Sequence, residues 1–264
     1  MLWWTSGLLI SHLQELRGSL VRCCSAIPGA IQVDLPNQLL RGLVLGLHVG
    51  HSVEVERGQC DCLMPIGLCA HSPSPPVSAV ACAGAGGKTL ALAELMERTG
   101  TVVAGDIRAY KLDDLRKRAR RAGFPNIMTR PWDGKKISGK QAANFDGVLV
   151  DAPCSCSGVW RRNPDGRWST TAADVDAMAP IQREVLDHAA PAVRPGGVLV
   201  YATCSVFASE NQAVVADFLA SHPEFIPEAF ENPLDGTPVE DGMLAIDGSA
   251  DNSDSMFVAR LRRR

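Results

Sequence analysis

Two cysteines stand where two apolar runs of the sequence end, and a thiol is a side chain well suited to nucleophilic attack on carbon. The motif DAPCS at 151–155 closes the first run, and YATCS at 201–205 closes the second. Ligands of open parallel sheets bind outside the carboxyl ends of the strands. We therefore expect Cys154, Cys204 and Asp151 to converge on one cleft, although a cysteine in an apolar strand is usually a small buried hydrophobe.

Paired thiols suit one demanding methyl transfer. Carbon 5 of cytosine is a weak nucleophile, but a thiolate that adds to carbon 6 turns the ring into an enamine whose carbon 5 can attack a sulfonium methyl group. A second thiol can then assist removal of the carbon-5 proton and release of the enzyme. The attacking thiol must be ionised, and a neighbouring cation or a helix N-terminus would lower its pKa.

A glycine-rich segment precedes both cysteines. The sequence ACAGAGGKT at 81–89 follows an apolar run and opens a helical one, so its glycines allow the backbone to turn close to a ligand. A phosphate-binding loop would need glycine in place of Cys82, although Lys88 fits the end of that motif. Asp106 ends the next apolar run, where a Rossmann-like site places the carboxylate that binds ribose hydroxyls. Together these features favour a nucleoside cofactor over a nucleoside triphosphate or a plain strand-to-helix turn.

Strands and helices that alternate along the chain must position these residues. Strands are predicted over 77–82, 101–106, 147–153 and 197–204, and helices over 88–98, 108–122, 174–193 and 209–220. In the third helix a spacing of three and four predicts one buried face, formed by Val175, Met178, Ile181, Val185, Leu186 and Ala189. Short unbroken apolar strands between amphipathic helices indicate an α/β fold with a mostly parallel sheet covered on both faces.

The bulk composition is that of a soluble globular protein. The chain has 264 residues, 46% hydrophobic and 21% charged, which excludes a disordered or membrane protein and allows one large domain or one domain with an appendage. Nine cysteines, an odd number, suit a reducing compartment, so we expect a cytoplasmic location, with an organellar or nucleolar one as the alternative. No membrane segment or signal peptide is predicted.

A formal net charge of −3 gives no general signal for nucleic-acid binding, so any RNA contact must be local. The basic candidates are Arg116, Lys117, Arg118, Arg120 and Arg121, the pair Arg161 and Arg162, and the tail Arg260, Arg262, Arg263 and Arg264. Such runs are more often solvated helix faces than binding sites.

The Pro/Ser stretch at 71–78 divides the chain. Residues 1–74 are interpreted as an atypical N-terminal segment, poorly defined or partly disordered, with a possible helix near 8–22. Its Cys60, Cys62, Cys69 and His71 lack the spacing of a zinc site, so they are interpreted as incidental and no metal site is predicted. Residues 75–264 form the predicted catalytic domain.

Three blocks of sequence identify a family. ACAGAGGKTL, DAPCSCSGVWRRNPDGRW and LVYATCSVFASENQAVV resemble, in order and spacing, the bacterial 16S ribosomal RNA cytosine-5 methyltransferases of the Sun/Fmu group and their eukaryotic nucleolar relatives. The resemblance covers about 78–264, where DSMFVARLRR looks like the last strand. It implies a Rossmann-like S-adenosylmethionine-dependent methyltransferase fold with a mostly parallel seven-stranded sheet, acting on RNA, with rRNA expected and tRNA as the alternative.

The resemblance also implies residue roles. Cys204 would attack carbon 6 of the cytosine and Cys154 would help to release the product. S-adenosylmethionine would be held by Cys82, Ala83, Gly84, Ala85, Gly86, Gly87, Lys88, Asp106, Asp133 and Asp151. Asp106 would take the ribose, Asp133 the adenine edge, and Asp151 the methionine end beside the target base. Arg161 and Arg162 would face RNA, whereas Glu210 and Asn211 are expected to cap the helix after Cys204.

Three features depart from the family pattern. Val80 stands where the family usually has aspartate, which is expected to weaken cofactor binding. Cys156 stands where the family has glycine, and a side chain there opposes a positive φ. Residues 1–77 lack the family's preceding RNA-binding elements, so they are interpreted as a divergent extension or as the product of a shifted reading frame or misjudged splice. The alternative function is an inactive cofactor-binding remnant of the family.

Overall fold

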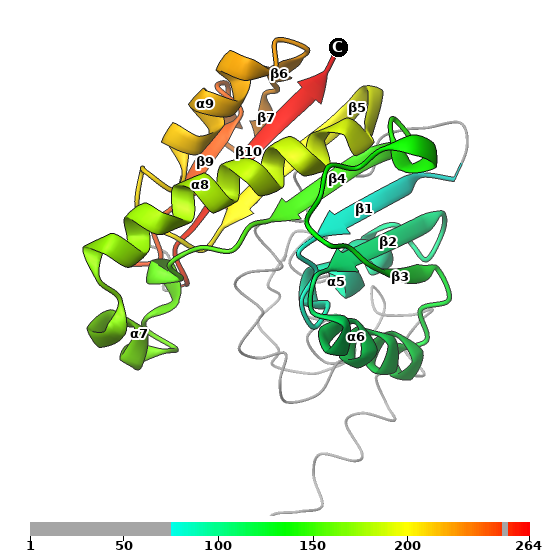
Figure 1. Cartoon of the computed structure of the whole chain (residues 1–264), viewed down its shortest axis with the longest axis horizontal. Coiled ribbons are helices and arrows are strands. Elements are labelled where there is room, and N and C mark those ends of the chain that lie inside the picture. The colour runs from blue at the N-terminus through cyan, green and yellow to red at the C-terminus, as the bar shows by residue number, and fades with distance from the viewer. Residues whose placement is uncertain (1–74, 250–252) are drawn as a thin grey trace, which may run out of the picture. The chain divides into compact units, whose positions relative to one another are not determined.

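The computed structural model of the chain describes residues 75–249 and 253–264 (Figure 1). The predicted N-terminal segment 1–74, with its possible helix and its cysteines, lies outside the described residues, so the predictions made for it stay predictions. Among the helices that are described, none combines the length and the apolar character that crossing a membrane requires.

The described residues form one eight-stranded sheet with the order β3-β2-β1-β4-β5-β10-β6, in which β9 also pairs with β10. The strands are β1 Val77–Ala81, β2 Thr101–Asp106, β3 Ile127–Pro131, β4 Phe145–Asp151, β5 Val193–Thr203, β6 Phe225–Pro227, β9 Met243–Ile246 and β10 Met256–Arg263. The helices are α5 Gly87–Leu95, α6 Ala109–Ala122, α7 Pro164–Ser169, α8 Ala172–Ala189 and α9 Gln212–Ser221. Separately, β7 Phe230–Glu231 and β8 Pro238–Val239 pair with each other.

Five strands, from β3 to β5, run parallel, and β10 enters antiparallel beside β5. The outer edge of β10 is shared: β9 pairs with its first half and β6 with its last residues. The sheet therefore has seven positions across its width and one strand more than predicted, because two short strands divide the last position. The predicted α/β, Rossmann-like methyltransferase fold is confirmed.

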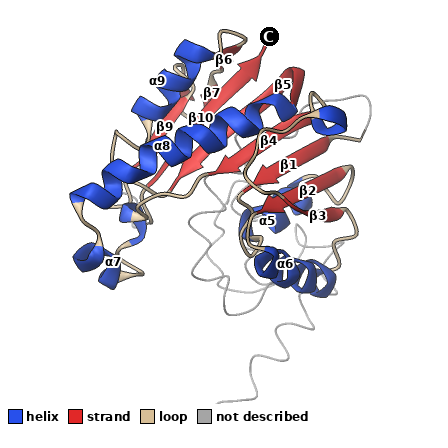
Figure 2. Ribbon diagram, viewed as in Figure 1, coloured by secondary structure: helices blue, strands red, loops and turns tan. Residues whose placement is uncertain are grey.

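Helices cover both faces of the sheet, as the alternation predicts. Side chains of α5 and α6 pack on one face with Val102, Leu149 and Val200, while side chains of α8 and α9 pack on the other with Val150 and Tyr201. Figure 2 shows α8 and α9 lying along the same face. Strand residues of opposite parity thus enter two separate cores, which explains why the strands are apolar throughout rather than alternating.

The predicted buried face of α8 is only partly confirmed, because Met178 and Val185 are half-buried and Ile181 is exposed. Val175, Leu186 and Ala189 are buried, but Ile181 is 41% exposed and its neighbour Gln182 is fully buried instead. The reason is polar: the Gln182 side chain donates hydrogen bonds to the Pro153 carbonyl and to Glu210. Gln182 therefore faces the loops that carry the cysteines, while Ile181 lies toward solvent.

Candidate active site

The glycine loop between β1 and α5 needs left-handed backbone at three positions. Cys82, Gly84 and Gly86 have φ of 58°, 55° and 88°. A Cβ on Gly86 would lie 2.0 Å from Leu115 Cδ1 in α6, so only glycine fits there, whereas no atom lies within 4 Å of the Cβ position on Gly84. The loop is therefore packed against α6 on one side and open beside Gly84, as a backbone that approaches a ligand must be.

Asp106 closes β2 directly beside this loop. Its buried carboxylate accepts hydrogen bonds from the Gly84 N–H at 2.8 Å, from the Arg108 N–H at 2.8 Å and from the Arg108 guanidinium at 3.1 Å. Burial raises the pKa of Asp106, but these bonds outweigh it and hold the pKa below its usual range. The carboxylate predicted to bind ribose is thus ionised, touches the loop, and is covered by the half-exposed Arg108 side chain.

Lys88, in the first turn of α5, reaches across to β4. Its Nζ lies 2.9 Å from Asp151 Oδ2, so a cation of α5 and an anion at the end of β4 form an ion pair at the carboxyl edge of the sheet. Two nearby carboxylates, Asp151 and Asp106, add to burial in raising the pKa of the Cys82 thiol to about 12. Lys88, the residue that fits the end of a phosphate-binding loop, is thus paired with a carboxylate.

The two predicted catalytic cysteines meet. Cys154 Sγ, beyond β4, lies 3.4 Å from Cys204 Sγ, beyond β5, because parallel pairing of β4 with β5 brings their carboxyl ends together. A third thiol joins them, since the sulfurs of Cys154, Cys156 and Cys204 all lie within 4.8 Å of one another. Cys156 adopts a φ of 56° despite its side chain, so the loop keeps the left-handed turn that was predicted to be difficult there.

The three thiols influence each other's ionisation. Hydrogen bonds to Cys154 and Cys156, together with burial, raise the pKa of Cys204. The contact with Cys156 likewise raises the pKa of Cys154. Hydrogen bonds from the other two thiols lower the pKa of Cys156, aided by the charges of Lys88 and Arg162. The three thiols therefore titrate as one coupled group, in which ionisation of one sulfur opposes ionisation of the next.

Glu210 joins the two cysteine loops, contrary to the prediction that it caps a helix. Its fully buried carboxylate accepts hydrogen bonds from the Ser155 N–H at 2.8 Å, the Gln182 side chain at 2.8 Å and the Ser205 hydroxyl at 2.6 Å. One side chain thereby holds the residue after Cys154, the residue after Cys204, and α8. Sequence reasoning missed this role, and the only signal was a charged residue six positions after the second cysteine.

Asn211 also binds the Cys204 loop rather than capping α9. It occupies the N-cap position, but in the part of the chain that the structure describes its side chain makes no capping bond. Instead its amide donates to the Ser205 carbonyl at 2.9 Å and accepts from the Thr203 hydroxyl at 2.6 Å. The Cys204 backbone is thus flanked by two fixed residues.

Gly158 joins the same loops, and the sequence did not point to it. Its N–H donates to the Cys204 carbonyl at 2.8 Å and its carbonyl accepts from the Ser255 N–H at 3.0 Å. A Cβ on Gly158 would lie 2.1 Å from the Ser255 carbonyl oxygen, so a larger residue would push the Cys154 loop away from the segment before β10. The Cys154 loop and the Cys204 loop are therefore joined through backbone as well as through Glu210.

The predicted RNA-facing arginines have different surroundings. Arg162 Nε lies 2.6 Å from Asp254, which is only 3% exposed, so Arg162 fixes its loop to the segment before β10. Arg161 lies 3.8 Å from the same carboxylate and its side chain is 60% exposed. An RNA role stays a prediction for both residues, and the structure leaves Arg161 the more accessible of the two.

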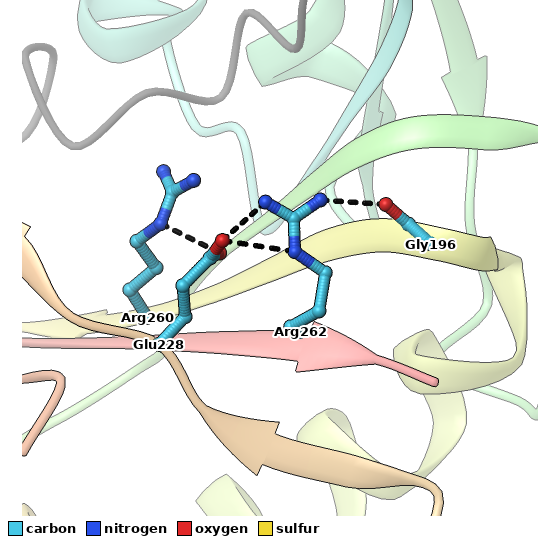
Figure 3. A network of polar contacts seen from close by, with 4 residues as sticks. All are labelled: Gly196, Glu228, Arg260 and Arg262. Carbon is cyan, nitrogen blue, oxygen red and sulfur yellow. Dashed lines mark hydrogen bonds and ion pairs between the residues drawn. The ribbon is translucent and has the colours of Figure 1, made fainter.

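The basic C-terminal tail serves the fold. Figure 3 shows Glu228, just after β6, between Arg260 and Arg262 of β10, and Arg262 also reaches the Gly196 carbonyl. Arg263 donates to the Val193 carbonyl at the start of β5. These three arginines are engaged in contacts within the sheet, whereas Arg264 is exposed.

Asp133 is the predicted cofactor residue least embedded in the site. Its side chain is 63% exposed and lies 3.3 Å from Lys135 Nζ. Bonds from the Lys135 backbone and side chain hold its pKa below the usual range. The preceding Trp132 N–H donates to the Asp106 carbonyl at 3.2 Å, which places the segment beside the end of β2. Its contact with the adenine edge stays a prediction.

The fold is that of a Rossmann-like, S-adenosylmethionine-dependent methyltransferase. The family described as 16S rRNA methyltransferase RsmB/F matches residues 79–262, so the chain belongs to that family. Members of this family take their methyl group from S-adenosylmethionine. The predicted resemblance is confirmed.

Individual relatives agree. The chain is 34% identical over 233 residues to a probable ribosomal RNA small subunit methyltransferase B of Bacillus subtilis, covering 86% of this chain and 52% of that protein. It is 35% identical over 186 residues to ribosomal RNA small subunit methyltransferase F of Serratia proteamaculans, covering 69% and 39%. The crystal structure of NSun6 from Pyrococcus horikoshii with SFG matches with a TM-score of 0.60 and 27% identity over 71% of this chain and 48% of that one. The chain spans about half the length of these relatives or less.

Proposed function

We propose that this chain transfers a methyl group from S-adenosylmethionine to carbon 5 of a cytidine in RNA, with ribosomal RNA as the substrate class. The observation that carries the proposal is the 3.4 Å approach of Cys154 Sγ to Cys204 Sγ beside the glycine loop. Membership of the RsmB/F family supports the same reaction and the same class of RNA. The target nucleotide leaves its stack to reach the thiols, because the reacting carbons are not accessible within a helix.

Cys204 and Cys154 each have one role in this proposal. Cys204, as thiolate, forms a bond to carbon 6, and carbon 5 then carries the electron pair that accepts the methyl group. Cys154, at 3.4 Å, assists when the carbon-5 proton leaves and the bond between carbon 6 and Cys204 Sγ breaks. The buried Glu210 and the backbone of Gly158 hold the two loops so that both sulfurs face the same base.

The residues at this edge of the sheet fit S-adenosylmethionine, which supplies an electrophilic methyl group on a sulfonium. Asp106, ionised and beside the loop, offers acceptors for the two ribose hydroxyls once the exposed Arg108 side chain turns away. Lys88 and Asp151 offer one cation and one anion for the zwitterionic methionine end. The open surface beside Gly84 gives the nucleoside room against the backbone.

Replacing Asp106 with asparagine is expected to weaken S-adenosylmethionine binding by about 10- to 100-fold, since hydrogen bonds to a charged acceptor contribute about 1.5–3 kcal/mol. Isothermal titration calorimetry measures the dissociation constant. Arg108→Ala is the matched control: it removes the guanidinium over the same carboxylate and should bind as tightly as the native chain or more tightly. Equal weakening by both substitutions would contradict a ribose site at Asp106.

Replacing Cys154 with alanine is expected to trap the enzyme on its RNA. The adduct forms through Cys204, but its release slows by about 100-fold, as is typical when a group that assists proton transfer is lost. A denaturing gel of the variant incubated with RNA and S-adenosylmethionine would then show a protein band shifted by covalent RNA. A shifted band with Cys204→Ala, and none with Cys154→Ala, would reverse the two roles.

The function itself is tested by mapping 5-methylcytidine by bisulfite sequencing in ribosomal and transfer RNA from cells with and without the gene. We expect one or more sites to lose methylation and to regain it when the native gene is restored. Unchanged maps, combined with no transfer of labelled methyl groups to total RNA in vitro, would favour an inactive cofactor-binding remnant. A lost site in transfer RNA alone would correct the substrate class.

A further inference from the structure

The third thiol of the cluster has no part in the proposed methyl transfer, which needs only two. Cys156 Sγ lies 3.5 Å from the Cys154 carbonyl and within 4.8 Å of both other sulfurs. We propose that Cys154, Cys156 and Cys204 form a three-thiolate site for a thiophilic d10 cation of the Zn²⁺ class, and that its occupancy switches methyl transfer off.

The sulfur positions fit such an ion. A Zn–S bond of about 2.3 Å in tetrahedral geometry places sulfurs about 3.8 Å apart. Cys154 and Cys204 are separated by 3.4 Å and the whole cluster lies within 4.8 Å, so shifts of well under 1 Å bring all three to bonding distance. Three protein ligands leave a fourth position for water.

The surroundings allow entry and fix the ligands. Cys156 is exposed while Cys154 and Cys204 are half-buried, so the cation can reach the cluster past Cys156. The left-handed φ of 56° at Cys156 holds its backbone in the turn from which its sulfur lies beside the Cys154 carbonyl. Glu210 and Gly158 join the two loops that carry the ligands, so these loops need little further ordering when the cation binds.

Metal binding replaces thiol protons with the cation and changes no oxidation state. The cation forms three bonds to sulfur, and up to three thiol protons leave to solvent. The sulfur of Cys204 then has its electron pair on the metal and cannot add to carbon 6. Metal binding does not depend on the proposed methyl transfer, but the inhibition rests on it.

Metal binding is tested by titrating the full-length chain with Cd²⁺ and following the ultraviolet thiolate-to-metal absorption, then displacing it with Zn²⁺. Cysteines 60, 62 and 69 are replaced by serine in every sample, to remove other thiols considered as ligands. We expect one equivalent bound by three thiolates, and a weakening of at least about 100-fold in Cys156→Gly, since each ligand contributes a large share of the affinity. Cys82→Ser, a thiol outside the cluster, should bind as the parent does.

Cys156→Gly relieves the positive φ and should fold, and Cys156→Ser, checked by its thermal midpoint, gives a second test. Unchanged affinity in both variants, or absorption that corresponds to fewer than three thiolates, would overturn the site. Inhibition is read as methyl transfer with and without Zn²⁺ and after a chelator. Transfer that resists Zn²⁺ in the parent overturns the switch, whereas no transfer under any condition, with metal binding intact, counts against the proposed function and leaves the site standing.

Discussion

Cys204→Ala is expected to lower methyl transfer to RNA by more than about 1,000-fold, because removal of the nucleophile removes the covalent route and not merely one contact. Transfer of label from S-adenosylmethionine to RNA measures the loss. The dissociation constant for S-adenosylmethionine should stay within about threefold of the native value, since Cys204 lies with the thiols and not in the glycine loop. Loss of activity with intact cofactor binding is the signature of a missing nucleophile.

The control for this substitution lies two residues along the same loop. Val206→Ala removes an exposed side chain that does not belong to the thiol cluster, so methyl transfer should change by less than about twofold. Cys204→Ser separates the nucleophilicity of the side chain from its size, because a hydroxyl is nearly isosteric with a thiol but far less ionised. The serine variant should be almost as inactive as the alanine variant. Full activity in either Cys204 variant would remove Cys204 from the reaction.

Much of the fold followed from short-range patterns. The strands at 101–106 and 147–153 and the helix at 108–122 were predicted within a residue or two, because continuous apolar runs and a three-to-four spacing are local signals. The shared outer edge of β10 was not predicted. A strand of three residues such as β6 is too short to show a hydrophobic periodicity. Its place in the sheet depends on pairing with β10, which comes later in the chain.

The site was predictable where topology alone decides proximity. Parallel strands have their carboxyl ends on one edge, so Cys154 and Cys204 had to be neighbours if β4 and β5 were, and the structure places them so. Cys156 could not be placed, because its position depends on one positive φ that its residue type disfavours. Glu210 was predicted to cap a helix because a glutamate near a helix start usually interacts with the backbone of that helix. Its partners instead include Ser155 and Gln182, which lie far from it in the sequence.

Glu210→Ala should strongly lower the stability of the domain. Three donors, from Ser155, Gln182 and Ser205, would lose a buried carboxylate acceptor, and buried donors left without a partner cost about 1–3 kcal/mol each. Since such losses are not additive, we expect the free energy of unfolding to fall by about 3–5 kcal/mol, a large share of the roughly 5–15 kcal/mol typical of a domain. Methyl transfer should fall as well, because the loops of Cys154 and Cys204 would no longer be joined through this side chain.

Chemical denaturation of the full-length chain, followed by circular dichroism, measures this change, and two variants make it specific. Glu210→Gln keeps one acceptor oxygen for the Ser155 and Gln182 donors, so it should cost only about 1 kcal/mol and retain part of the activity. Glu184→Ala removes an exposed glutamate from α8 and should cost less than about 0.5 kcal/mol. If Glu210→Ala unfolds no more easily than Glu184→Ala, the buried carboxylate does not hold the two cysteine loops together, and their approach must depend on backbone contacts such as that of Gly158.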